Sequence, residues 1–113
     1  MKKVEAIIRL EKLEDLKEAL SFTGYATGMT VTQVLGFGNQ KGVTEFVRGQ
    51  EIVTSLLPKI QVMWIVKEEI VDNLVKLIIE VCRTGEVGDG KIFVMDVEEV
   101  IRIRTGEKGE QAI

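Results

Sequence analysis

The chain has 113 residues, of which 45% are hydrophobic and 29% charged, proportions that are typical of one soluble globular domain spanning residues 1–113. Its net charge of −3 argues against a nucleic-acid-binding protein, because such proteins present strongly basic surfaces. One cysteine and no histidine exclude a disulfide framework, a cysteine–histidine metal site and a Cys–His nucleophile.

The first predicted elements are a strand and a helix. Residues 3–10 alternate in polarity, as a strand requires. One face of this strand would carry Val4, Ala6, Ile8 and Leu10, and the other Glu5, Ile7 and Arg9. Residues 13–24 repeat leucine and alanine at helical spacing, so we expect a helix that ends at Gly24.

Two more strands are predicted on either side of a long segment. Residues 29–38 are rich in β-branched side chains and alternate in polarity, which indicates a strand. Residues 59–66 indicate another strand, whose apolar side would carry Ile60, Val62, Trp64 and Val66.

A second helix and the last strands complete the chain. Residues 68–85 carry an apolar stripe at helical spacing and end at Gly85, and residues 91–97 and 100–105 alternate as strands do. The order is βαββαβ with a short extra strand. That order predicts an α+β, ferredoxin-like fold, in which one antiparallel sheet carries both helices on one face.

The sheet face opposite the predicted helices is also apolar in part. It would carry Ile7, Met63 and Ile65. Because exposed apolar patches of this kind mark interfaces, we expect self-association to cover it.

Residues 84–91, TGEVGDGK, fit the G-x-x-x-x-G-K spacing of a phosphate-binding P-loop. A P-loop follows a strand, opens a helix and continues with Ser or Thr. Here a helix precedes the loop, a strand follows it and the next residue is Ile92, so we reject the P-loop interpretation. Two interpretations stay open: a flexible turn after a helix, or a loop whose backbone amides bind an anion beside Lys91.

Arg102 and Arg104 stand two residues apart in the predicted last strand. Their guanidinium groups would project from the same face of that strand. They form either a solvated surface or, together with Lys91, a clamp for one polyphosphate, because planar guanidinium groups suit phosphate oxygens.

The segment of residues 38–57 connects two predicted strands and shows no clear structural period. Loops of this length in small domains are usually functional or disordered. Its apolar side chains exceed what a linker needs, so we expect an element that docks on a partner. The side chains concerned are Phe46, Val47, Arg48 and Ile52.

The motifs AIIR, GMTVTQVLGFGNQKG, RG, LPK, TGEVGDGKIFV and VIRIRTGE occur in this order along the chain. Because of these motifs, the chain resembles the PII nitrogen-regulatory signal-transduction proteins over essentially its whole length. The resemblance implies a homotrimer with a nucleotide in each cleft between neighbouring subunits. It identifies residues 38–57 as the T-loop, which would bind protein targets such as an ammonium transporter. ATP and ADP would compete for the cleft, and 2-oxoglutarate would join Mg-ATP and reshape the T-loop.

The resemblance also implies which residues would bind each ligand. Adenine and ribose would lie against Ile7, Thr30, Gly36, Phe37, Gly38 and Ile65. The phosphates would lie among Gly88, Asp89, Gly90, Lys91, Arg102 and Arg104. The effector 2-oxoglutarate would use Arg9, Gln40, Lys41 and Lys59, with the Gln40 side-chain oxygen as a magnesium ligand.

Three positions depart from the family pattern. Asn39 stands where many members have a phosphate-contacting arginine, which leaves the preference for ATP or ADP open. Ile52 replaces a tyrosine that other members uridylylate, and Gln50 replaces a serine that others phosphorylate. We therefore expect control by ligands alone.

The sequence favours a non-enzymatic sensor over a slow nucleotide hydrolase in the same cleft. Asp89 and Glu107 are the only carboxylates near the phosphate motifs, and no nucleophile–base pair is evident. An RNA-binding domain would need a basic face and a pattern of stacking aromatic residues, and the sequence has neither. The N-terminal residues lack a signal-peptide core, so we expect a cytoplasmic protein that a transporter partner recruits to the membrane.

Overall fold

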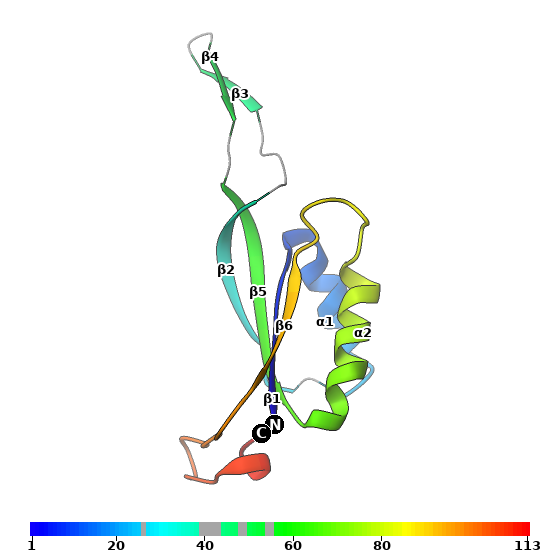
Figure 1. The fold of residues 1–113 in the computed structure, drawn as a ribbon, viewed down its shortest axis with the longest axis vertical. Helices are drawn as coiled ribbons and strands as arrows, with labels where there is room; N and C mark the ends of the chain where they lie inside the picture. The colour runs from blue at the N-terminus through cyan, green and yellow to red at the C-terminus, as the bar shows by residue number, and fades with distance from the viewer. Residues whose placement is uncertain (26, 39–43, 48–49, 54–55) are drawn as a thin grey trace.

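The computed structural model describes residues 1–25, 27–38, 44–47, 50–53 and 56–113 of the chain (Figure 1). Within these residues, four strands and two helices form the body of the protein. In chain order they are β1 (Lys2–Arg9), α1 (Leu13–Ser21), β2 (Thr30–Phe37), β5 (Leu56–Val66), α2 (Val71–Cys82) and β6 (Lys91–Asp96). Short 3-10 helices are η1 (Leu10–Lys12), η2 (Glu68–Ile70) and η3 (Gly109–Ala112).

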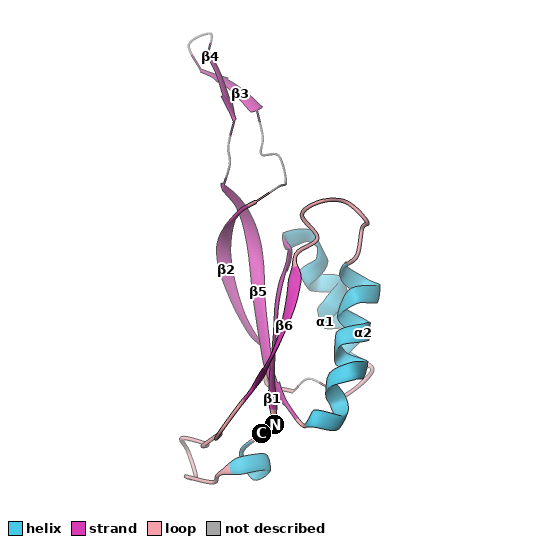
Figure 2. Cartoon of the chain, viewed as in Figure 1, coloured by secondary structure: helices cyan, strands magenta, loops and turns pink. Residues whose placement is uncertain are grey.

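The sheet has the strand order β2-β5-β1-β6, and every neighbouring pair is antiparallel. Both helices lie on one face of it (Figure 2). The predicted βαββαβ order is therefore confirmed. The register places Lys59 opposite Arg9, Lys91 opposite Ile7 and Leu57 opposite Gly36, so these residues gather at one end of the sheet.

The core lies between the sheet and the helices. Alternate residues of the two central strands are buried there, namely Val4, Ala6, Ile8, Ile60, Val62, Trp64 and Val66. The helices bury Leu16, Leu20, Leu74, Ile78 and Cys82 against them. Burial with a period of two in the strands and of three to four in the helices agrees with the predicted faces, except at Leu10. Leu10 was expected on the apolar face of the first strand, but β1 ends at Arg9 and Leu10 is an exposed residue of η1.

Residues 38–57 are more regular than the sequence indicated. They contain strands β3 (Thr44–Val47) and β4 (Gln50–Val53), which pair as an antiparallel hairpin beyond the ends of β2 and β5 (Figure 1). The prediction of a segment without structural period was wrong because a hairpin of two short strands needs only local pairing, which periodicity over a long window does not detect. Of the T-loop residues named above, Asn39, Gln40, Lys41 and Arg48 lie outside the described residues.

The predicted strand over residues 100–105 was also wrong. This segment forms a closed turn with a single bridge between Ile101 and Lys108. Backbone hydrogen bonds within the turn run from Arg102 N to Glu107 O (2.9 Å) and from Gly106 N to Arg102 O (2.7 Å). The backbone polar groups thus find partners locally, and Gly106 reverses the chain at a φ of 72° that favours glycine.

The helices end earlier than predicted. Helix α1 stops at Ser21 rather than Gly24, and α2 stops at Cys82 rather than Gly85. Both glycines follow the helix ends with positive φ, 68° and 90° respectively, so they turn the chain after the last helical residue. No helix in the described part of the chain is both long and apolar enough to span a membrane.

Cys82 is a free cysteine buried at the end of α2. Burial raises the pKa of its thiol from 9.0 to about 11. We expect native protein at pH 8 to resist thiol reagents that react readily with it in urea, as absorbance would show. Equal labelling of native and denatured protein would contradict this protection of the thiol.

Between pH 9.0 and about 11 the folded state retains the thiol proton of Cys82, whereas the unfolded state loses it. The free energy of unfolding should therefore fall as the pH rises through this range.

Candidate functional site

An open cavity of about 350 Å³ lies where β2, β5 and β1 meet the loop between α2 and β6. Its lining residues come from four separate segments of the chain. They are Ile7, Gly36, Phe37, Gly38, Leu57, Lys59, Val87, Gly88, Gly90, Lys91 and Phe93. The volume falls within the range of ligand-binding pockets, and the lining combines apolar side chains with two lysines.

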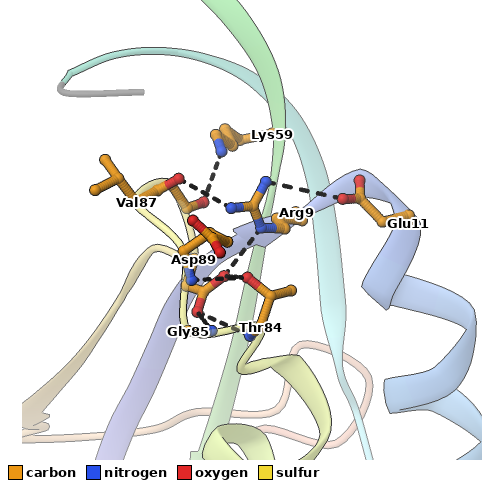
Figure 3. Close-up of polar contacts among 9 residues, drawn as sticks. Arg9, Glu11, Lys59, Thr84, Gly85, Val87 and Asp89 are labelled. Carbon is orange, nitrogen blue, oxygen red and sulfur yellow. Dashed lines mark hydrogen bonds and ion pairs between the residues drawn. The ribbon is translucent and has the colours of Figure 1, made fainter. Parts of the chain in front are cut away.

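The loop of residues 84–90 is folded around the carboxylate of Asp89 (Figure 3). One carboxylate oxygen accepts hydrogen bonds from the backbone amides of Thr84 and Gly85, each at 2.9 Å. The other accepts from the Thr84 hydroxyl at 2.5 Å and from Arg9 Nε at 3.0 Å. The hydrogen bond from the Thr84 hydroxyl, and next that from Arg9, hold the pKa of Asp89 well below its usual range, so the carboxylate is ionised at neutral pH.

Two cations of the sheet also hold this loop. Arg9 donates from Nη2 to the Val87 carbonyl at 2.9 Å, and Lys59 donates from Nζ to the Gly88 carbonyl at 2.7 Å (Figure 3). The Lys59 side chain is buried, and its pKa is lowered by burial and then by the neighbouring charge of Arg9. A bound anion would stabilise two neighbouring cations of which one is buried.

Gly90 brings the loop into contact with β1. Its φ is +97°, and a Cβ atom built there would lie 1.6 Å from the carbonyl oxygen of Ile7. Gly36 faces Lys59 at closer than ordinary range, since a Cβ there would lie 3.2 Å from Lys59 Cγ. Only glycine at position 90 allows the loop to approach the sheet this closely.

The cavity collects much of the predicted nucleotide site. Its lining includes the predicted residues Ile7, Gly36, Phe37, Gly38, Gly88, Gly90 and Lys91, together with Lys59 from the predicted effector site. Sequence reasoning missed Leu57, Val87 and Phe93. For Phe93 a signal was available, because residues two apart on a strand share a face and Lys91 was already assigned.

Four residues of the predicted nucleotide site lie far from the cavity in the single chain. Thr30 pairs with Met63 and Ile65 with Lys3, so both stand near the opposite end of the sheet from Gly36. At roughly 3.3 Å per residue, Ile65 lies about 25 Å along β5 from Leu57.

Arg102 and Arg104 belong to the turn that follows β6 at this distant end. Arg102 donates from Nη1 to the Glu107 carboxylate at 2.8 Å and from Nη2 to the Gln111 carbonyl at 3.0 Å, whereas Arg104 is exposed. The predicted arrangement of the two guanidinium groups on one strand face is therefore not formed.

Comparison with known proteins adds an independent observation. A sequence profile of the family described as nitrogen regulatory protein P-II matches residues 1–107. The chain is 57% identical over 113 residues to the nitrogen regulatory protein P-II of Pasteurella multocida (strain Pm70), with 100% of each chain covered. With the same coverage it is 55% identical to nitrogen regulatory protein P-II 1 of Escherichia coli (strain K12). It is also 55% identical to the P-II protein of Klebsiella oxytoca.

Proposed function

The chain belongs to the nitrogen regulatory protein P-II family, and from this membership we propose that it binds ATP or ADP in clefts between the subunits of a homotrimer. With Mg-ATP it would bind 2-oxoglutarate and change the state of its protein targets. The family assignment confirms the expected role in nitrogen regulation and the expected class, since P-II proteins are signal transducers and not enzymes.

The cavity at the glycine loop is the observation that supports nucleotide binding most directly. It brings Ile7 and residues 36–38 together with Gly88, Gly90 and Lys91, although these three segments are far apart in the sequence. Ile7, Phe37 and Phe93 offer apolar surface to a base. The glycine-rich backbone beside Lys91 offers amide donors and a positive charge to phosphates.

A second subunit would supply the predicted residues that one chain leaves apart. Thr30, Ile65, Arg102 and Arg104 sit at the far end of the sheet, so a neighbour that laid this end over the cavity would complete the cleft. Exposed apolar side chains favour such contacts: Phe37 at the cavity is 76% exposed, and Ile103 beside the two arginines is fully exposed.

Assembly is directly measurable. We expect ligand-free protein at micromolar concentration to elute with a mass of three 12.6 kDa chains, about 38 kDa, because the exposed apolar surface favours closed association. Light scattering coupled to size-exclusion chromatography gives the mass independently of shape. A mass of 12.6 kDa would contradict the shared cleft, because the far arginines could not then reach the cavity.

Lys59 fits the effector role, since it is a buried cation that lines the cavity beside Arg9. The described residues hold no group of three or more Asp, Glu, Cys or His side chains that could bind a metal ion. Magnesium would be held by oxygens of the bound ligands and by Gln40, and when bound it would supply a hard cationic centre for phosphate and carboxylate oxygens. Gln40 and Lys41 lie outside the described residues, and their part in effector binding is proposed from the family resemblance alone.

We expect 2-oxoglutarate to bind only when Mg-ATP is present, as calorimetry can show. Gln40→Ala should remove effector binding and spare most ATP affinity. Lys59→Gln should weaken effector binding by about 1.5–3 kcal/mol, because a charge-assisted contact is lost. Lys76→Gln, at an exposed lysine in the middle of helix α2 that does not line the cavity, is the matched control and should change nothing. Equal effector binding with ADP, or without metal, would contradict the proposed order.

Target binding is assigned to the T-loop, which includes the hairpin β3–β4 and the docking residues Phe46, Val47, Arg48 and Ile52. An ammonium transporter would recruit the protein from the cytoplasm to the membrane. A slow nucleotide hydrolase in the same cleft is the competing function. A steady-state hydrolysis assay distinguishes them, since turnover at ordinary enzyme rates of roughly 1 s⁻¹ or above would favour the hydrolase.

A further inference from the structure

We propose that Asp89 is a positioning residue of the nucleotide site, which shapes the glycine loop from within and joins it to Arg9 without touching phosphate. This inference rests on the proposed nucleotide-binding function and deepens it. It assigns to Asp89 a part different from that of its neighbours Gly88 and Gly90, which line the cavity.

The carboxylate of Asp89 has its acceptor positions occupied by the chain itself. Its two oxygens accept four hydrogen bonds, from the amides of Thr84 and Gly85, the Thr84 hydroxyl and Arg9 Nε, at 2.5–3.0 Å. A carboxylate offers about four acceptor positions, so these contacts use its capacity. The guanidinium of Arg9 balances its charge at the same place.

The orientation of the side chain separates Asp89 from the phosphates. The flanking residues Gly88 and Gly90 line the cavity, but Asp89 does not. In Figure 3 its side chain is directed toward Thr84 and Gly85 on the inner side of the loop. A carboxylate facing the cavity would repel phosphate oxygens, whereas one on the inner side can hold the loop in shape while the backbone faces the ligand.

Asp89 also connects the loop to the sheet. Arg9 holds Asp89 through Nε and the Val87 carbonyl through Nη2, while Lys59 holds the Gly88 carbonyl. Loss of the carboxylate would leave Arg9 with one of its two loop contacts and release two backbone amides. The amides that face the cavity would then lose their fixed direction, and phosphate binding would weaken.

Thr84 is the second member of this arrangement. Its hydroxyl donates to Asp89 and accepts from the amide of Glu86 at 3.1 Å. The hydroxyl therefore links both ends of the loop. Removing it should reproduce part of the effect of removing the carboxylate.

The test is ATP binding by Asp89→Asn, measured by calorimetry with and without magnesium. Asparagine keeps the size of the side chain and one acceptor oxygen. Its NH₂ group must then face either the two backbone amides or Arg9 Nε, all of which need an acceptor, and the negative charge that pairs with Arg9 is lost. We expect ATP affinity to fall about tenfold, by the same factor with and without magnesium, because a broken charge-assisted network has this scale. Adenosine, which has no phosphate, should lose less affinity.

Three results would overturn the proposal. Tighter ATP binding would show that the carboxylate faces the phosphates. A loss seen only with magnesium would show that it faces the metal. Unchanged ATP affinity would show that the loop does not depend on it.

Thr84 variants serve if Asp89→Asn does not fold. Thr84→Val should lower ATP affinity by a few-fold, whereas Thr84→Ser should keep most of the wild-type affinity, because serine keeps the hydroxyl.

Where Asp89→Asn folds, the double variant Asp89→Asn/Thr84→Val should bind ATP about as Asp89→Asn alone does, since the two groups act through one contact. Additive losses would contradict this.

A ligand-free measurement separates this inference from the proposed function. Amide hydrogen exchange at Thr84 and Gly85 should be faster in Asp89→Ala than in the wild type, because both amides lose their acceptor. If the wild type bound no ATP, the proposed function would fail. The exchange rates would still decide whether Asp89 organises the loop, and unchanged rates would refute that role.

Discussion

Replacing Gly90 by alanine is expected to lower the free energy of unfolding by about 2–4 kcal/mol and to weaken ATP binding at least tenfold. Two effects add at this position. The backbone has a φ of +97°, which L residues rarely adopt, and the new methyl carbon would lie 1.6 Å from the Ile7 carbonyl oxygen. Because that oxygen belongs to the central strand β1, the loop must move away and the cavity must open.

Gly85→Ala is the matched control for this variant. Its φ of +90° is similar, but in the described part of the chain no atom beyond its sequence neighbours lies within 4 Å of the added Cβ. We expect it to cost only about 1–2 kcal/mol through backbone strain. Urea denaturation followed by circular dichroism, at one fixed protein concentration, measures both variants. Equal losses would show that strain alone, and not the approach to Ile7, makes Gly90 necessary.

Trp64→Ala is expected to lower the free energy of unfolding by about 3–5 kcal/mol. Trp64 lies on the helix-facing side of β5 and is fully buried, so alanine would leave a large cavity between the sheet and the helices. Since Trp64 is the only tryptophan, circular dichroism rather than fluorescence must follow unfolding of the variant.

Trp64→Phe is the informative companion. Among the described residues, the buried indole nitrogen of Trp64 has no hydrogen-bond partner. Phenylalanine removes this unsatisfied donor, which is worth about 1–3 kcal/mol, and so offsets much of the lost packing. We expect a net change below about 1.5 kcal/mol. A loss as large as that of Trp64→Ala would show that the indole nitrogen is bonded in solution.

The sequence predicted the body of the fold well because buried positions recur along the chain at the regular spacing of a strand or a helix. Val4, Ala6 and Ile8 are buried at alternate positions because one face of β1 packs on the helices. The same alternation failed at residues 100–105, where isoleucine and arginine also alternate. A period of two shows which face of a strand would be buried but supplies no partner strand, and this segment bonds within its own turn.

The candidate site was predictable only in part for a similar reason. The glycine-rich motif left two interpretations, a flexible turn or an anion-binding loop, and the loop lines the cavity. The motif did not indicate that Asp89 turns inward, since this depends on Thr84 and on Arg9, eighty residues away. Leu57 enters the cavity through its pairing with Gly36, which spacing within one segment does not specify.

The glycine loop divides its positions into constrained and tolerant ones. Gly90 is restricted by its approach to Ile7, and Asp89 by its hydrogen bonds. Glu86 instead contributes its backbone amide, and its side chain is exposed. Evolution can therefore replace Glu86 without disturbing the loop, so related chains could diversify the outer surface of the loop while its ligand-facing backbone stays the same.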